Sequence, residues 1–108
     1  MAAIPDSTKT SIRLRLRQHA RDHWPQITDL DVTYHGAFIY VSAAIDDSDE
    51  PIPLFRLRYG GSAHSFGFAI YSPARDRYER SLLLTGLPAG TPQEALDTTA
   101  IAHALTRT

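Results

Sequence analysis

Cysteine is entirely absent from this 108-residue chain. A chain without thiols forms no disulfides, has no thiolate zinc site and has no cysteine nucleophile, so three common routes to stability or chemistry are excluded. A single domain of this length buries enough surface to fold without such cross-links. The absence of cysteine also fits a reducing compartment. We therefore expect one domain over residues 1–108, with residues 1–6 flexible.

Long hydrophobic runs are missing as well. No apolar stretch approaches the roughly 18 residues that a membrane-spanning helix needs. The opening sequence MAAIPDSTKT has neither the basic segment nor the apolar segment of a secretory signal. We therefore expect a cytoplasmic protein with no membrane partner. Hydrophobic residues make up 43% of the chain and charged residues 21%, as in ordinary globular domains, so extended disorder is not expected.

The net charge of −1 gives no overall attraction to nucleic acid, but the charges are segregated along the chain. Residues 9–21 are basic without an acid, residues 22–50 are acidic without lysine or arginine, and residues 56–80 are again mostly basic. Such blocks either neutralise each other in the fold or leave opposite patches on two faces. Nearly all the basic residues are arginine, which suits phosphate recognition, although a GC-rich coding sequence gives the same bias.

The stretch SIRLRLRQHA alternates apolar residues with arginine as a half-buried strand does, but the longer pattern favours a helix. An apolar residue recurs every four positions and would form one buried stripe: Ile12, Leu16, Ala20, Trp24. Asp6 and Ser7 are candidate N-caps, and Pro25 supplies a stop. The sequence predicts a helix over residues 7–23, with Leu14 as the one apolar residue on its far side.

Four further stretches are predicted to be strands, and all but the second alternate with a period of two. They are LDVTYH (30–35), AFIYVSAAI (37–45), LFRLRY (54–59) and FGFAIY (66–71). The second stretch is apolar on both faces, which is typical of a central strand or of one that is covered on both sides. A polar loop, SPARDRYER, then leads to SLLL (81–84), which is predicted as a short fifth strand.

The clearest local signal is in GTPQEALDTTAIAHAL. Thr91 has the character of an N-cap, Pro92 follows at the first helical position, and Glu94 completes a capping box. This pattern predicts a helix over residues 92–106.

The predicted order is helix, four or five strands, helix, with short connections throughout. This order favours an α+β fold in which a single antiparallel sheet carries the N-terminal and C-terminal helices on one face. The other face of the sheet would carry residues from the third and fourth strands: Arg56, Arg58, Gly67, Ala69, Tyr71.

Signatures of catalysis and of metal binding are weak. His19 and His23 lie four residues apart on a helix, a spacing that can present two imidazoles to one metal ion, but no third ligand is placed beside them. Partly buried helix histidines are the favoured interpretation, so no metal site and no cofactor are expected. DDSDE lacks the calcium-loop pattern, and YGGSAHS joins two strands rather than a strand to a helix. We expect that the protein is not an enzyme.

Arginines on one strand face are the main candidates for binding. Arg56 and Arg58 would lie beside small residues and Tyr71, an arrangement that suits backbone phosphates or a stacked base. Pairing with acids of the neighbouring strands is the alternative role, and the net charge lacks the basic excess of most nucleic-acid-binding domains. The candidate binding residues are Arg56, Arg58, Tyr71, Arg75, Arg77.

Residues 53–97, PLFRLRYGGSAHSFGFAIYSPARDRYERSLLLTGLPAGTPQEALD, resemble a family of short uncharacterised proteins common in GC-rich bacteria. The resemblance covers nearly half of the chain. It implies a bacterial origin and brings no activity with it.

Residues 54–104 have a looser likeness to a three-strand-plus-helix DNA-binding domain, that of plant ethylene-response factors and of recombinase arm-binding domains. The residues in the matching order are Tyr59-Gly60, Ala69-Ile70, Leu84, Gly86, Thr91, Glu94-Ala95. The likeness implies DNA binding through the sheet. However, Gly61-Ser62-Ala63 and Tyr71 stand where that family carries basic residues. Only Arg56 and Arg58 could act as substitutes.

The sequence therefore leaves several functions open. The first is a non-catalytic interaction module that binds another protein or itself, as indicated by the missing catalytic signatures, the apolar second strand and the segregated charge. The alternative is nucleic-acid binding through the arginine-bearing sheet face. A third is a small-molecule or metal site between the first helix and the sheet.

Overall fold

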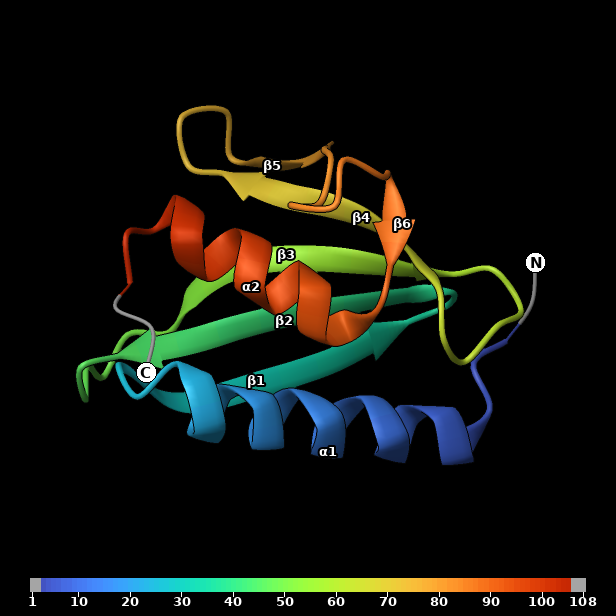
Figure 1. Cartoon of the computed structure of the whole chain (residues 1–108), viewed down its shortest axis with the longest axis horizontal. Coiled ribbons are helices and arrows are strands. Elements are labelled where there is room, and N and C mark those ends of the chain that lie inside the picture. Colours follow the sequence, from blue (N-terminus) through green and yellow to red (C-terminus); the bar gives the residue numbers. More distant parts are fainter. Residues whose placement is uncertain (1–2, 106–108) are drawn as a thin grey trace.

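The computed structural model describes residues 3–105, and this part of the chain forms two helices and a six-stranded sheet (Figure 1). The elements are α1 (Asp6–His23), β1 (Ile27–His35), β2 (Phe38–Ile45), β3 (Ile52–Tyr59), β4 (Phe66–Ser72), β5 (Arg77–Arg80), β6 (Ala89–Gly90) and α2 (Pro92–Ala102). The strands are antiparallel, and both helices lie on the same side of the sheet. The predicted α+β architecture is confirmed. No helix within residues 3–105 is long and apolar enough to cross a membrane.

Strands that follow one another in the chain are neighbours in the sheet, in the order β1-β2-β3-β4-β5. β6 pairs with the beginning of β4, where β5 does not reach. The register aligns Tyr40 with Arg56, Arg56 with Ala69, and Ala69 with Arg80. Four strands therefore place one residue each in a row across the sheet.

The core lies between the helices and the sheet. The predicted stripe of α1 is buried, with every member at most 4% exposed: Ile12, Leu16, Ala20, Trp24. Alternate residues of the central strands face it: Ile39, Val41, Phe55, Leu57, Phe66, Phe68. Leu14 is 63% exposed, as expected of the apolar residue on the far side of the helix.

The start of α1 differs from the prediction. Pro5 is the N-cap and receives no side-chain capping bond, so neither Asp6 nor Ser7 caps the helix. Asp6 lies instead in the first turn, where its negative charge interacts favourably with the exposed amides of the helix. Residues 1–6 were expected to be flexible. Residues 1–2 lie outside the described part of the chain, whereas Ile4 is buried in the core.

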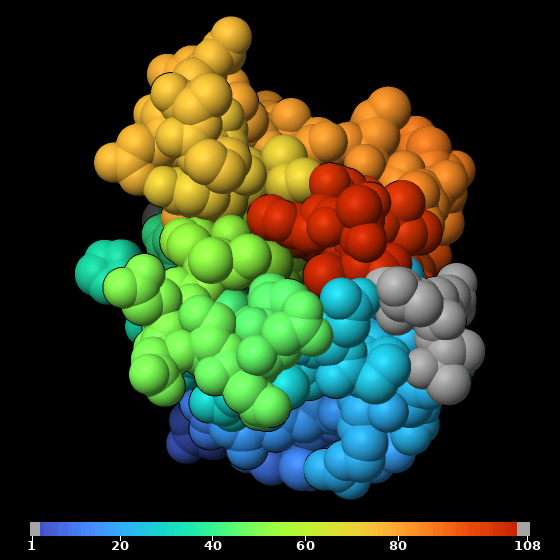
Figure 2. All heavy atoms as spheres, turned by 90° about the vertical axis from the view of Figure 1, so that its left-hand side faces the viewer, coloured from blue at the N-terminus to red at the C-terminus, as the bar shows by residue number. Residues whose placement is uncertain are grey.

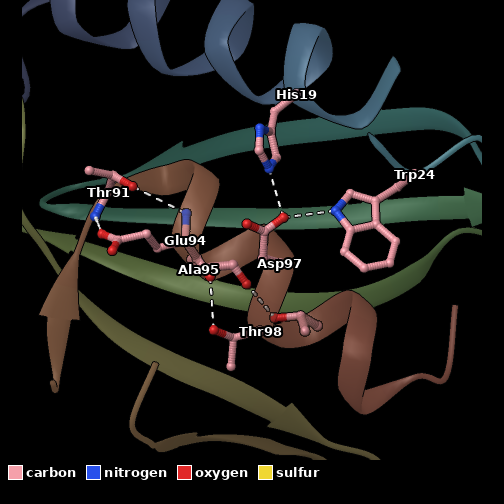
Figure 3. Close-up of polar contacts among 8 residues, drawn as sticks. His19, Trp24, Thr91, Glu94, Ala95, Asp97 and Thr98 are labelled. Atoms are coloured by element: carbon pink, nitrogen blue, oxygen red, sulfur yellow. Dashed lines mark hydrogen bonds and ion pairs between the residues drawn. The ribbon is translucent and has the colours of Figure 1, made fainter. Parts of the chain in front are cut away.

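The capping box of α2 is confirmed. The backbone N–H of Glu94 donates to Thr91 Oγ1, and the Glu94 carboxylate accepts from the backbone N–H of Thr91 (Figure 3). Two of the amides left free at the start of the helix are thereby paired.

The predicted end of α2 at residue 106 is wrong. The helix ends at Ala102, and residue 106 itself lies outside the described residues. Ala104 has a φ of 58°, and its amide and that of the next residue bond back to carbonyls in the last turn. This is the Schellman ending, in which glycine is the usual left-handed residue. Because alanine occupies that position here, the sequence carries no stop signal.

The predicted fifth strand is misplaced. Residues 81–84 form a loop, and β5 lies within the stretch predicted to be a polar loop, where Arg77–Arg80 pair with β4. Asp76, at a φ of 50°, lies in the turn between β4 and β5. β5 lies at an edge of the sheet and carries charged residues, so it has no hydrophobic alternation by which the sequence could reveal it.

A polar cluster joins the two helices (Figure 3). Asp97 Oδ1 of α2 accepts from His19 Nε2 at 2.7 Å and from Trp24 Nε1 at 2.9 Å. The side chains of His19 and Asp97 are only 17% and 18% exposed. Hydrogen bonds to a charged acceptor are stronger than neutral ones, especially when they are partly shielded from water. Asp97 therefore holds the end of α1 against the middle of α2.

Replacing Asp97 with alanine removes the acceptor of both bonds. We expect the free energy of unfolding of Asp97→Ala to fall by about 2–3 kcal/mol, as measured by urea denaturation. Asp22→Ala is the control, because Asp22 is exposed and, within residues 3–105, its carboxylate accepts from Gln18 of its own helix alone. The control should change stability by about 0.5 kcal/mol or less. Equal effects of the two substitutions would show that the cluster does not hold the helices together.

Candidate functional site

The face of the sheet turned away from the helices, here called the open face, carries the residues of greatest functional interest. The register brings together side chains of four strands: Phe38, Tyr40, Arg56, Arg58, Gly67, Ala69, Tyr71, Tyr78, Arg80. Neither α1 nor α2 lies on this face (Figure 1). The predicted outward residues of β3 and β4 are therefore on the exposed side of the sheet.

Four aromatic rings are contiguous on the open face. Tyr78 packs edge-on against Tyr40, with ring centroids 5.4 Å apart, and against Tyr71 at 5.2 Å. Phe38 continues the cluster at 6.4 Å from Tyr40. Tilted and edge-to-face contacts of this kind are favourable for aromatic pairs. All four rings are only half-buried, so part of each ring is accessible to a ligand.

Arg56 lies between two of these rings. Its guanidinium carbon is 4.6 Å from the centre of Phe38 and 5.6 Å from the centre of Tyr78. Cation–π attraction holds the charged group in one orientation while leaving its N–H donors at the ring edges. The aromatic cluster therefore fixes the position of an arginine on the open face.

A groove of about 520 Å³ runs beside Arg56. Its lining residues come from five strands and the loop between β5 and β6: Phe38, Arg56, Arg58, Gly67, Phe68, Ala69, Arg80, Ser81, Pro88, Ala89. Gly67 and Ala69 have minimal side chains, which leaves space above β4 between the arginines. Within residues 3–105, none of the three arginines Arg56, Arg58 and Arg80 forms an ion pair. The groove thus has three positive charges and no acid in its lining.

Acidic residues gather at a different place, around the start of β1 and the end of β2. A hollow of about 450 Å³ there is lined by Thr28, Asp29, Asp31, Ala44, Asp47, Ser48, Asp49, Pro51. The charge blocks of the sequence therefore do not cancel, and the molecule has an arginine groove and a separate acidic end. An anionic ligand is attracted to the groove and repelled from the acidic end.

Arg75 and Arg77 have a different role from the groove arginines. Both pair with Glu79, with nitrogen-to-oxygen distances of 2.8 Å and 3.6 Å. Partial desolvation raises the pKa of the Glu79 carboxyl, but the hydrogen bond and charge of Arg75, aided by Arg77 and Ser72, outweigh it and lower the pKa overall. The structure places Arg75 and Arg77 in the β4–β5 hairpin, outside the groove lining. Tyr71 is the remaining candidate binding residue, and its hydroxyl donates a hydrogen bond to the carboxylate of Asp76.

The two candidate metal ligands on α1 lie close together, with ring centroids 4.6 Å apart. His19 directs its Nε2 to Asp97, as described above. In the part of the chain that the structure describes, no group of three histidine, aspartate or glutamate side chains could hold a metal ion.

Sequence reasoning missed four residues of the open face: Phe38, Tyr40, Tyr78, Arg80. Residues 37–45 were predicted to be a strand that is apolar on both faces, which did not show which side Phe38 and Tyr40 would take. In the structure, both alternate with the buried Ile39 and Val41. β2 is central, as predicted, but the helices cover only one of its faces. Tyr78 and Arg80 lie in β5, a segment that was predicted to be a loop.

No family model, curated protein or solved structure matches the chain. The geometry of the described residues is therefore the basis for a functional interpretation.

The pKa of Tyr78 provides a test of its contact with Arg56. Burial and the neighbouring Tyr40 raise this pKa, while the positive charge of Arg56 lowers it. Because a cation stabilises the phenolate, Arg56→Gln should raise the pKa of Tyr78 further. NMR titration of ¹³C-labelled tyrosine measures this change. Arg58→Gln is the matched control and should leave Tyr78 unchanged. An unchanged pKa in Arg56→Gln would place the guanidinium away from the ring.

Proposed function

We propose that the protein is a non-catalytic module that binds single-stranded nucleic acid on its open face. The observation that carries this proposal is one groove lined by three arginines that form no ion pair within residues 3–105, next to a cluster of half-buried aromatic rings. Phosphates and bases are the two components of a nucleic acid, and each has a matching group on this face.

The arginines supply the phosphate-binding component. Guanidinium groups bind phosphate oxygens with two parallel hydrogen bonds, and Arg56 is already held in position by Phe38 and Tyr78. An arginine fixed by its neighbours loses less conformational freedom when it binds a phosphate. The lack of acids in the groove means that a phosphate meets no opposing charge there.

The aromatic rings favour a single strand over a duplex. Bases in a duplex are stacked on one another, whereas bases of a single strand are free to stack on tyrosine or phenylalanine. The open surface of an antiparallel sheet is a common support for such rings in single-strand-binding domains. Phe38, Tyr40, Tyr71 and Tyr78 supply these rings from three strands.

The net charge of −1 is compatible with this proposal. Local field, rather than total charge, attracts a ligand to a particular surface, and four of the twelve acids line the separate acidic end. The groove lining also contains no histidine, aspartate or glutamate, the usual general acids and bases, which supports a binding role rather than catalysis.

Fluorescence anisotropy with a labelled single-stranded oligonucleotide tests the proposal. For three phosphate contacts, affinity should fall by about tenfold or more between about 50 and 200 mM salt, and the matching duplex should bind more weakly. Substituting glutamine for Arg56, Arg58 or Arg80 should weaken binding and reduce the salt slope by about 0.7 per arginine.

The control for these variants is Arg21→Gln, which removes an exposed arginine of α1 on the other side of the molecule. It should bind like the unmodified protein. No binding at the lower salt concentration, an affinity independent of salt, or tighter binding of the duplex would contradict the proposal.

A ring on the open face should contribute to affinity without affecting the salt dependence. Tyr40→Leu removes a stacking surface and should lower single-strand affinity by about tenfold at every salt concentration. Tyr40→Phe keeps the ring and should retain the affinity. The same anisotropy titration measures both variants. Equal losses in both would mean that the ring of Tyr40 does not stack on a base.

A further inference from the structure

The three arginines of the groove stand on two opposite sides of β4. Arg56 and Arg80 are the register partners of Ala69, one on each neighbouring strand. Arg58 lies two residues after Arg56 on β3 and is the partner of Gly67. Because neighbouring strands lie about 4.8 Å apart, the backbones of β3 and β5 are separated by about 10 Å across the groove. A ligand between them therefore meets arginine on both sides.

The floor of the groove is left unfilled at Gly67. This glycine is not among the residues with a positive φ, so its backbone conformation does not require glycine. A Cβ at this position would lie 3.5 Å from the Cβ of Arg58, which is an ordinary van der Waals contact. A larger residue would thus fit the strand and would occupy the space above it. The glycine keeps that space open for a compact group.

The wall of the groove opposite β3, here called the far wall, is formed by β5 and the residues before β6. The amide of Ser81 donates to the carbonyl of Phe68 at 3.4 Å, and the amide of Phe68 donates to the carbonyl of Pro88 at 3.1 Å. Figure 2 shows the yellow β4–β5 hairpin beside the orange segment that follows it, at the end of the molecule opposite the blue α1. Both segments are held to β4, so Arg80 extends from a wall that is attached to the floor of the groove.

The terminal phosphate of a strand matches this arrangement in charge and in acceptors. A phosphate within a strand carries one negative charge and two free oxygens. A terminal phosphomonoester carries about −1.5 to −2 at neutral pH and has three free oxygens. Arginines on two sides of a ligand need acceptor oxygens on both sides, and the third oxygen supplies them. The terminal phosphate and the next phosphate together carry about three negative charges, which three arginines neutralise.

A run of internal phosphates matches the arginines less well. The phosphates of an extended strand follow one another in a line along the groove. Arg56 and Arg58 lie along one wall, about 7 Å apart, and can meet two such phosphates. Arg80 faces them from the far wall, out of that line. The arginines thus surround one position rather than track a backbone.

We propose that the arginine groove is the site for the terminal phosphate of a single strand, with the adjoining bases on the aromatic rings of the open face. This inference rests on the proposed binding of single-stranded nucleic acid and adds which part of the strand is recognised. Phe38 lines the groove and also contacts Tyr40 in the ring cluster. A base next to the bound phosphate therefore has a ring within reach.

Anisotropy titrations with one oligonucleotide sequence in four forms test this inference. The forms carry a 5′-phosphate, a 3′-phosphate, no terminal phosphate, or a terminal phosphate methylated to a diester. A phosphorylated end should bind about tenfold more tightly than the unphosphorylated strand, and a gain at either end supports the inference. The methylated form should lose most of this gain, because it keeps the phosphate but has one charge and two free oxygens.

Two substitutions connect the preference to the groove. Gly67→Val fills the floor with a residue that favours strands, and Arg80→Gln removes the arginine of the far wall. Each should reduce the ratio of the two affinities, phosphorylated over unphosphorylated, from about tenfold to about twofold or less. Arg77→Gln is the matched control, because Arg77 lies on the same strand outside the groove lining and should leave the ratio unchanged. Circular dichroism confirms that each variant remains folded.

The outcomes separate this inference from the proposed function. Equal affinity for phosphorylated and unphosphorylated strands would overturn the inference and leave single-strand binding in place, whereas no binding of any strand would overturn both. A preference that persists in both Gly67→Val and Arg80→Gln would place the terminal phosphate outside the groove.

Competition distinguishes the end of a strand from a free phosphate compound, which has the same phosphomonoester group. Inorganic phosphate and a nucleoside monophosphate should displace the phosphorylated oligonucleotide only at much higher concentrations, because neither covers the ring cluster. Displacement by the nucleoside monophosphate at the same concentration as by the unlabelled phosphorylated oligonucleotide would make a free nucleotide the ligand and would overturn recognition of a strand end.

Discussion

Burial of both helices against the same face of the sheet is the constraint on which the rest of the molecule depends. The apolar stripe of α1 and the buried face of α2 need a common apolar surface, and alternate residues of β2, β3 and β4 supply it. Asp97 then locks the two helices together above that surface. Because the strand period is two, every residue between the buried ones must point the other way. An open face with its own chemistry is therefore a consequence of how the core is built.

Much of the fold follows from local sequence patterns. The four-residue stripe of α1, the capping box of α2 and the alternation of Arg56 and Arg58 with buried neighbours are all visible in the chain. The pairing of residues distant in sequence is not visible in the chain. Tyr40 and Tyr78 lie in different strands. They share a face because the register of β2 through β5 aligns Tyr40 with Arg80, two residues from Tyr78. β5 escaped prediction because an edge strand of charged residues lacks the apolar alternation that identifies a strand.

The arginines of the basic blocks have three different roles in the structure. On α1, Arg13 donates to the carbonyl of Val32 and Arg15 to the carbonyl of Ala63, so these arginines hold the helix to the rest of the fold. In the β4–β5 hairpin, Arg75 and Arg77 share Glu79. Among these, only the groove arginines form neither a hydrogen bond nor an ion pair within residues 3–105. Sequence alone cannot distinguish the roles, because acceptors such as backbone carbonyls are assigned by tertiary contacts.

The β5–β6 loop has two surfaces with opposite properties. Its ends, Ser81 and Pro88, border the arginine groove, while Leu82, Leu84 and Leu87 between them are exposed to solvent. Exposed leucines lose the favourable free energy of burial, about 1.5–3 kcal/mol for each side chain fully buried, so an isolated monomer gains no stability from them. The internal hydrogen bonds of the loop and its attachment to Thr98 nevertheless keep them exposed. The loop therefore holds apolar side chains at the surface, next to the arginine groove.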